Sequence, residues 1–302
     1  MQRIASGIAK KGTESDLILY DKKERETALS IVIPKTYPER IQPLLYAMYM
    51  SDAAIFAPET ADSIAGEMIV ALSAFHKSGV VISGSDGMDR LTQILKSRGG
   101  NWLEIEENDA PGRLMEWIEG MELKRDENTE FWRVDVDHSF EVRGVGTVVL
   151  GIVRYGTVRV HDKVIASPTG KEGSVRSIQI FDVDYKEAPA GSRVGLALKG
   201  LDVEDVPRGT VITNNLRFQA AKTLRIMLRK ESYFRDPLDS GGNIDINTGL
   251  QSKTARIISS DGEIELETET EIAFENEEAT LFAAKPPGQL RIAGRGPAAR
   301  LI

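Results

Sequence analysis

The sequence predicts an α/β domain at the front of the chain, followed by a longer part that is built of β-strands alone. Over residues 1–126, short apolar runs alternate with segments whose apolar residues recur near a spacing of about 3.6, which is the pattern of strands alternating with helices. From Val134 onward, runs of Val, Ile and Leu are cut every few positions by turns that contain glycine. No helical period competes with this second pattern.

The strands and helices of the front domain follow one another in a regular order. The apolar runs expected to form strands are 17–20, 29–33, 53–57 and 80–83. The expected helices are 38–50, 60–78, 89–98 and 111–121. Such an alternation predicts a parallel-type α/β sheet.

Residues 134–212 have the pattern of a compact antiparallel barrel. Gly144 and Gly146 stand just ahead of a β-branched run, where a strand must bend sharply before it turns back. From Leu216 the alternation of apolar and polar residues resumes, for example over 223–228. We therefore expect the remainder of the chain to be built of strands as well.

Composition narrows the class of protein. The chain has 302 residues, no cysteine and a net charge of -8, which excludes disulfides and cysteine nucleophiles and argues against indiscriminate binding to DNA. A local basic patch could still bind RNA. The three dispersed histidines, His76, His138 and His161, have no metal-ligand spacing, so no metal site is expected. No apolar run approaches the roughly 20 residues of a membrane span and no secretory signal is present, so we expect a cytoplasmic protein without membrane contact.

Three blocks in the β-rich part resemble the second domain of the elongation factor Tu superfamily of translation GTPases, most closely its SelB-like archaeal branch. The blocks read GVGTVVLGIVRYGTVRVHDKV, VRSIQIFDVD and APAGSRVGLALKGLDVEDVPRGTVI. Residues 249–257, Gly-Leu-Gln-Ser-x-x-Ala-Arg-Ile, resemble the third domain of the same superfamily. The resemblance implies a degenerate, truncated P-loop-type GTPase domain over 1–126, a first β-barrel over 131–213 and a second β-barrel over 216–302.

The front domain departs from the motifs that a GTPase of this superfamily needs. The phosphate-binding loop GxxxxGK[ST] does not occur, and the first βα unit is expected to be missing. At the Asp-x-x-Gly motif, Ile33 stands for the aspartate, Thr36 for the glycine and Tyr37 for the histidine that often follows. At the guanine-reading Asn-Lys-x-Asp motif only Asp86 survives, as a remnant nucleotide-binding candidate or as an ordinary turn residue.

These losses remove the groups that stabilise charge during phosphoryl transfer. We therefore expect no catalytic residues and no GTP hydrolysis. No cofactor is expected either, and GTP with magnesium would bind only at a remodelled site.

The resemblance implies that the first barrel receives the aminoacylated end of a tRNA, with the ribosome as a further partner. The corresponding stretch includes Arg176, which could pair with a phosphate, and Phe181, which could stack on a base. The full set of candidate tRNA-binding residues is Arg176, Gln179, Phe181, Arg193, Arg291 and Arg295. The plainer interpretation is that Arg176 is a solvated strand residue and that residues 288–302 form a solvated final strand.

Two alternatives remain open at the level of sequence. The first is an active GTP-binding elongation factor whose phosphate-binding loop lies outside this sequence. The second is a protein-interaction or regulatory module that binds neither tRNA nor nucleotide, which the acidity of the chain favours. The sequence does not identify the tRNA, ribosome contact or the oligomeric state.

Overall fold

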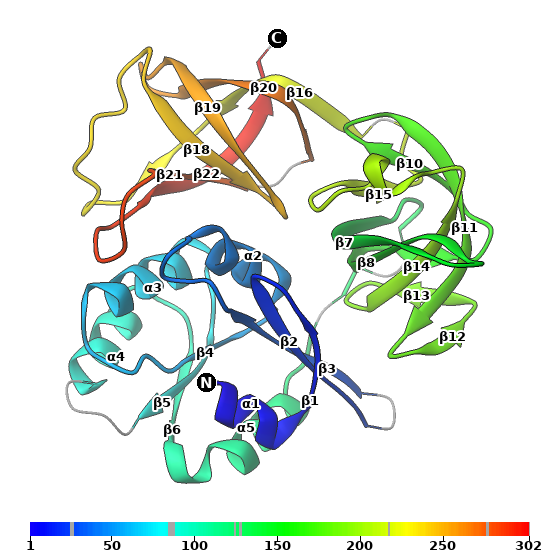
Figure 1. Cartoon of the computed structure of the whole chain (residues 1–302). Helices are drawn as coiled ribbons and strands as arrows, with labels where there is room; N and C mark the ends of the chain where they lie inside the picture. The colour runs from blue at the N-terminus through cyan, green and yellow to red at the C-terminus, as the bar shows by residue number, and fades with distance from the viewer. Residues whose placement is uncertain are drawn as a thin grey trace. The chain divides into compact units, whose positions relative to one another are not determined.

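The computed structural model in Figure 1 describes residues 1–302 apart from 25–26, 84–87, 124, 127–128, 217, 276–277 and 302. By its contacts the chain divides into two compact units. The first unit contains Met1–Leu123, Arg229–Asp236 and Leu281–Arg295, and the second contains Lys124–Leu228, Pro237–Thr280 and Gly296–Ile302. Within the described ranges, no helix combines the length and the apolar character needed to cross a membrane.

Residues 1–123 fold as helices and short strands. In chain order they are α1 (Gln2–Ile8), β1 (Lys10–Glu14), β2 (Leu17–Glu24), β3 (Thr27–Pro34), α2 (Gln42–Met50), β4 (Ala54–Phe56), α3 (Ser63–Ala74), β5 (Gly79–Ser83), α4 (Met88–Ser97), β6 (Trp102–Glu106) and α5 (Ala110–Glu119). A short 3-10 turn, Glu107–Asp109, precedes α5.

The strands of this region form two separate three-stranded sheets. Strands β4, β5 and β6 pair in parallel, as the sequence predicts for 53–57 and 80–83. The prediction of a parallel sheet is wrong for 17–20 and 29–33, because β2 and β3 pair antiparallel, with Ile18 opposite Ile33. Only two residues separate these strands, and a parallel pair needs a crossover of about a dozen.

Two predicted helices are shorter in the structure. Helix α2 begins at Gln42 rather than at residue 38. Helix α3 begins after Asp62, whose carboxylate accepts hydrogen bonds from the backbone N–H groups of Ile64 (2.9 Å) and Ala65 (3.0 Å) as an N-cap. It ends at Ala74, and His76 has a left-handed backbone (φ 50°), which a helix cannot continue through.

Two apolar clusters form the core of the first unit. One joins α2, α3 and α4 to the parallel sheet, and it includes Phe282 and Ile292 from the far end of the chain. The other joins α1 and α5 to both sheets, with Ile18 and Ile82 among its members. Residues 281–295 thus share a core with residues 1–123.

The first barrel is confirmed. Its strands are β7 (Arg133–Val142), β8 (Gly146–Tyr155), β9 (Thr157–Arg159), β10 (Lys163–Ser167), β11 (Lys171–Ile180), β12 (Val183–Tyr185), β13 (Glu187–Pro189), β14 (Arg193–Lys199) and β15 (Val211–Thr213). Six of them close a ring in the order β10-β15-β7-β8-β14-β11, because β11 also pairs with β10. Gly144 and Gly146 take φ values of 80° and 98° in the turn between β7 and β8, where the sequence predicts a bend.

The second barrel is also confirmed. It contains β16 (Gln219–Ile226), β17 (Arg229–Lys230), β18 (Asn243–Thr248), β19 (Gln251–Ser259), β20 (Ile264–Phe274), β21 (Glu278–Phe282) and β22 (Ile292–Arg300). Its ring runs β16-β20-β19-β18-β21-β22 and closes through pairing of β16 with β22. Both β21 and β22 pass from one compact unit into the other along their length.

Candidate functional site

The outer face of β11 carries two of the predicted tRNA-binding side chains. The pairing of β11 with β14 is irregular between Val175 and Ser177, so Arg176 is an extra residue in the strand. Val175 and Ile178 are buried in the barrel, whereas Arg176 and Gln179 are exposed. The bulge therefore keeps both polar side chains outside the barrel.

Arg176 lies at the wall of an open hollow of about 700 Å³. Its Nη1 donates a hydrogen bond to the carbonyl oxygen of Val145 at 2.6 Å, in the turn between β7 and β8. Lys199 lines the same hollow, together with the carboxylates of Glu141 and Asp202. The hollow carries charges of both signs next to apolar side chains such as Leu198 and Leu201.

Gln179 is exposed on β11 and hydrogen bonds to the neighbouring strand. Its Nε2 donates a hydrogen bond to Oδ1 of Asp184 on β12, at 2.9 Å. Gly195 on β14 is the strand partner of Gln179 on β11 and of Leu150 on β8. A Cβ atom at Gly195 would lie 3.5 Å from Leu150 Cδ2 and 4.0 Å from Gln179 Cβ, so neighbouring side chains already pack around this position.

Phe181 forms the turn between β11 and β12 together with Asp182. The two residues have φ values of 50° and 60°, the conformation of the two central residues of a type I′ hairpin turn. Asn-Gly is the usual sequence there, and a bulky residue in the left-handed region is strained by roughly 1–3 kcal/mol. Because Phe-Asp is not a turn signal, sequence reasoning missed this hairpin, although the short run between VRSIQI and VDY is compatible with it.

Arg193 takes part in a charged cluster on the same barrel. Asp137 is buried, and its carboxylate lies 3.8 Å from Arg193 Nη2 and 3.2 Å from Arg208 Nη2. Arg208 also donates a hydrogen bond to the Asp137 carbonyl oxygen at 2.8 Å. Asp137 and Arg208 were not predicted from the sequence, because nothing in their local patterns marks them.

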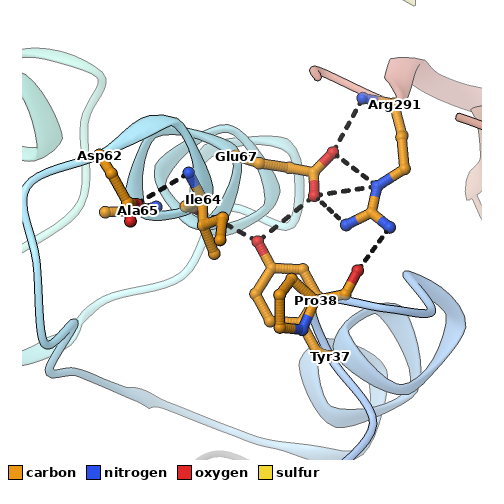
Figure 2. A network of polar contacts seen from close by, with 7 residues as sticks. All are labelled: Tyr37, Pro38, Asp62, Ile64, Ala65, Glu67 and Arg291. Carbon is orange, nitrogen blue, oxygen red and sulfur yellow. Dashed lines mark hydrogen bonds and ion pairs between the residues drawn. The ribbon is translucent and has the colours of Figure 1, made fainter. Parts of the chain in front are cut away.

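In the front domain, Tyr37 occupies the place of the expected histidine. Figure 2 shows its side chain directed inward to α3, with the hydroxyl 3.0 Å from the carbonyl oxygen of Ile64 and 3.3 Å from Oε2 of Glu67. Burial, followed by the negative charge of Glu67, raises the pKa of the Tyr37 phenol well above its usual range. Tyr37 is thus a neutral hydrogen-bond donor within the protein. Asp86, the predicted nucleotide remnant, lies outside the described residues.

Glu67 and Arg291 form a buried ion pair in the same network. They are 3% and 2% exposed. Arg291 Nε lies 3.1 and 3.2 Å from the two Glu67 oxygens, Nη2 lies 2.5 Å from Oε2, and the Arg291 backbone N–H donates to Oε1 at 2.8 Å. Nη1 of Arg291 donates to the carbonyl oxygen of Pro38 at 2.7 Å. The guanidinium is therefore bound on several sides by protein groups.

Arg295 contacts the end of the same helix. Its guanidinium carbon lies 3.9 Å from the centre of the Phe75 ring, and Nη1 donates to the carbonyl oxygen of Ala74 at 3.3 Å. Arg291 and Arg295 belong to the first unit, whereas Arg176 and Arg193 belong to the second. As a set of tRNA-binding residues the six candidates stay a prediction. In the part of the chain that the structure describes, no group of three or more His, Asp or Glu side chains could hold a metal ion.

The chain is similar in sequence to known proteins. A family model for elongation factor Tu domain 2 matches residues 146–213. The uncharacterized protein MJ0325 of Methanocaldococcus jannaschii is 36% identical over 278 residues, which cover 91% of this chain and 89% of that protein. The selenocysteine-specific elongation factor of the same organism is 34% identical over 146 residues, 48% of this chain and 31% of that factor.

Solved structures share the fold. Translation elongation factor SelB from Methanococcus maripaludis, in complex with the GTP analogue GPPNHP, matches with a TM-score of 0.83 and 20% identity, over 100% of this chain and 76% of that chain. The two-barrel architecture behind an α/β region is thus a fold shared with SelB. The chain belongs to the elongation factor Tu superfamily, in the family that includes the M. jannaschii protein MJ0325.

Proposed function

We propose that this translation-factor homologue binds an aminoacylated tRNA on the outer face of its first barrel, and that binding does not depend on GTP hydrolysis. The observation that carries the proposal is the exposure of Arg176 and Gln179 on β11, in the barrel that matches the elongation factor family model. Arg176 can pair with a phosphate, and the exposed amide of Gln179 can hydrogen bond to a base. The proposal includes a cytoplasmic location, where translation takes place, and leaves the ribosome as a further partner.

Independence from GTP hydrolysis is supported by the front domain. The sequence contains no GxxxxGK[ST] loop, and Ile33 replaces the aspartate on the magnesium side. Tyr37 hydrogen bonds to α3 and Glu67, so its hydroxyl is engaged inside the protein. A group held in this way does not position an attacking water, and the electrostatic terms of phosphoryl transfer have no source among these residues.

The test is a binding titration with aminoacylated and deacylated tRNA, with and without GTP and magnesium. We expect saturable binding that prefers the aminoacylated form and changes less than about twofold with GTP. Arg176→Ala and Gln179→Ala should each weaken binding about tenfold, the loss of roughly 1.4 kcal/mol expected for one charged or stacked contact.

A matched control is Arg159→Ala on the same barrel, where Arg159 Nε pairs with Glu187 at 3.0 Å and both side chains are exposed. It removes the same charge from β9 rather than from β11 and should leave binding unchanged. Equal loss with Arg159→Ala would mean that only net charge matters. Absence of tRNA binding would leave the protein-interaction alternative, and release of phosphate from GTP would contradict the proposed loss of hydrolysis.

A further inference from the structure

Residues 291–295 run along helix α3 and contact it at two points. Arg291 binds Glu67, and Arg295 stacks on Phe75. The two helix residues are eight positions apart, about 12 Å at 1.5 Å per residue. Arg291, which directly precedes β22, and Arg295 within β22 are four positions apart, about 13 Å at 3.3 Å per extended residue. The equal spacing lets both arginines engage α3 at once.

The Glu67–Arg291 contact cannot be loosened gradually. Both side chains are almost fully buried, and the carboxylate accepts hydrogen bonds from the Arg291 side chain and backbone. A small separation would leave a charge in the interior without its partner, which is far more costly than an intact pair. The contact is therefore either complete or absent.

Apolar packing acts in the same place. Phe282 and Ile292 are 1% and 0% exposed, in one cluster with Ile69 and Leu72 of α3. Pro38, whose carbonyl oxygen accepts a hydrogen bond from Arg291, directly follows Tyr37. Arg291 therefore binds both α3, through Glu67, and the segment that contains Tyr37, the residue in the place of the expected histidine.

We propose that the Glu67–Arg291 ion pair is maintained in every ligand state of the protein. It holds α3, the segment 33–38 and residues 291–295 in one conformation whether or not nucleotide or tRNA is bound. The proposal concerns conformation within the first unit and does not require that tRNA binds. Movement at this joint would have to break a buried ion pair, a cation–π contact and an apolar core together.

Hydrogen exchange on the whole chain tests whether the Glu67–Arg291 ion pair persists in all ligand states, with peptides covering 33–45, 63–75 and 286–296. In the wild type, addition of GTP with magnesium, GDP, or aminoacylated tRNA should change exchange in these peptides by less than about twofold. Arg291→Met should accelerate exchange in 63–75 and 286–296 by roughly 100-fold, since it leaves Glu67 buried and unpaired. Arg291→Met combined with Glu67→Met removes both charges and should recover at least about tenfold of that loss.

The matched control is Lys96→Met, which breaks the exposed pair between Lys96 and Glu104 (2.5 Å) in the same unit and should leave exchange unchanged. If Arg291→Met does not fold, Glu67→Gln and the double variant carry the comparison. A change of more than about tenfold in the wild type on adding any of the three ligands overturns the proposal. A double variant that exchanges as fast as the single variant overturns it too. Ligand binding is measured separately, so loss of tRNA binding with unchanged exchange would count against the proposed function alone.

Discussion

Arg176 and Arg291 show two opposite uses of one residue type. Arg176 projects from a bulge in β11 and makes its hydrogen bond to a turn at the edge of an open hollow. Arg291 is 2% exposed and bound to Glu67 and Pro38 on several sides. Arg176 was a candidate for tRNA binding because it lies in the stretch that corresponds to the tRNA-end pocket of the resembled family, and Arg291 because residues 288–302 carry several arginines. The comparison teaches that the partner, rather than the residue type, decides whether an arginine serves recognition or folding.

The largest expected effect separates these two arginines by stability. Arg291→Ala should destabilise the first unit by about 3–5 kcal/mol, because Glu67 is left buried without its partner. Arg176→Ala should change stability by less than about 0.5 kcal/mol, as an exposed substitution does. Urea unfolding followed by tryptophan fluorescence checks this, since Trp102 and Trp117 lie in the first unit. Similar urea midpoints for the two variants would contradict the claim that Arg291 stabilises the fold whereas Arg176 does not.

A second prediction concerns the pH dependence of stability that arises from the buried network of Tyr37, Glu67 and Arg291. The pKa of Tyr37 is raised in the folded state by burial and by Glu67, so the unfolded phenol ionises at lower pH than the folded one. Stability from this group is present below about pH 10 and is lost as pH rises above it, by up to about 1.4 kcal/mol per pH unit. Tyr37→Phe should therefore show a shallower decline between pH 9 and 11 than the wild type.

Tyr155 must be considered in the same experiment. Burial and the charge of Glu275, whose Oε1 lies 3.1 Å from its hydroxyl, raise the pKa of Tyr155 as well. Tyr37→Phe should thus remove one part of the alkaline decline and Tyr155→Phe another, measured as urea midpoints at each pH. If Tyr37→Phe declines as steeply as the wild type, the phenol is not held neutral by this network.

The fold was predictable where local sequence decides structure. Gly144 and Gly146 marked a bend because only a residue without a side chain takes those φ values readily. The antiparallel pairing of β2 with β3 was missed because strand direction depends on the connection, and the runs 17–20 and 29–33 do not reveal how far each strand extends. The hydrophobic pattern sets the presence of strands but not their direction.

The site was predictable only in part. The outward β11 residues follow from resemblance, whereas the pairing of Glu67 with Arg291 joins positions 224 apart in sequence, and no local pattern links them. One signal was available: Glu67 is the only charged residue in the otherwise apolar SIAGEMIVALSA of α3. A buried carboxylate in such a helix requires a cationic or multiply donating partner, although the sequence does not say which one.

The smallest expected effect concerns the strained turn on the open face. Phe181→Asn should stabilise the second unit by about 1 kcal/mol, because Asn adopts the left-handed backbone of a type I′ turn more readily than Phe. If Phe181 stacks on a base, the same variant should bind aminoacylated tRNA about tenfold more weakly.

Asp182→Gly is the matched control, since it relaxes the second turn position and keeps the aromatic ring. Thermal unfolding by circular dichroism and tRNA titration measure the two effects. Gain of stability together with loss of binding in Phe181→Asn, but unchanged binding in Asp182→Gly, would show that the strain is kept for recognition; unchanged binding in both would make Phe181 a residue of the turn alone.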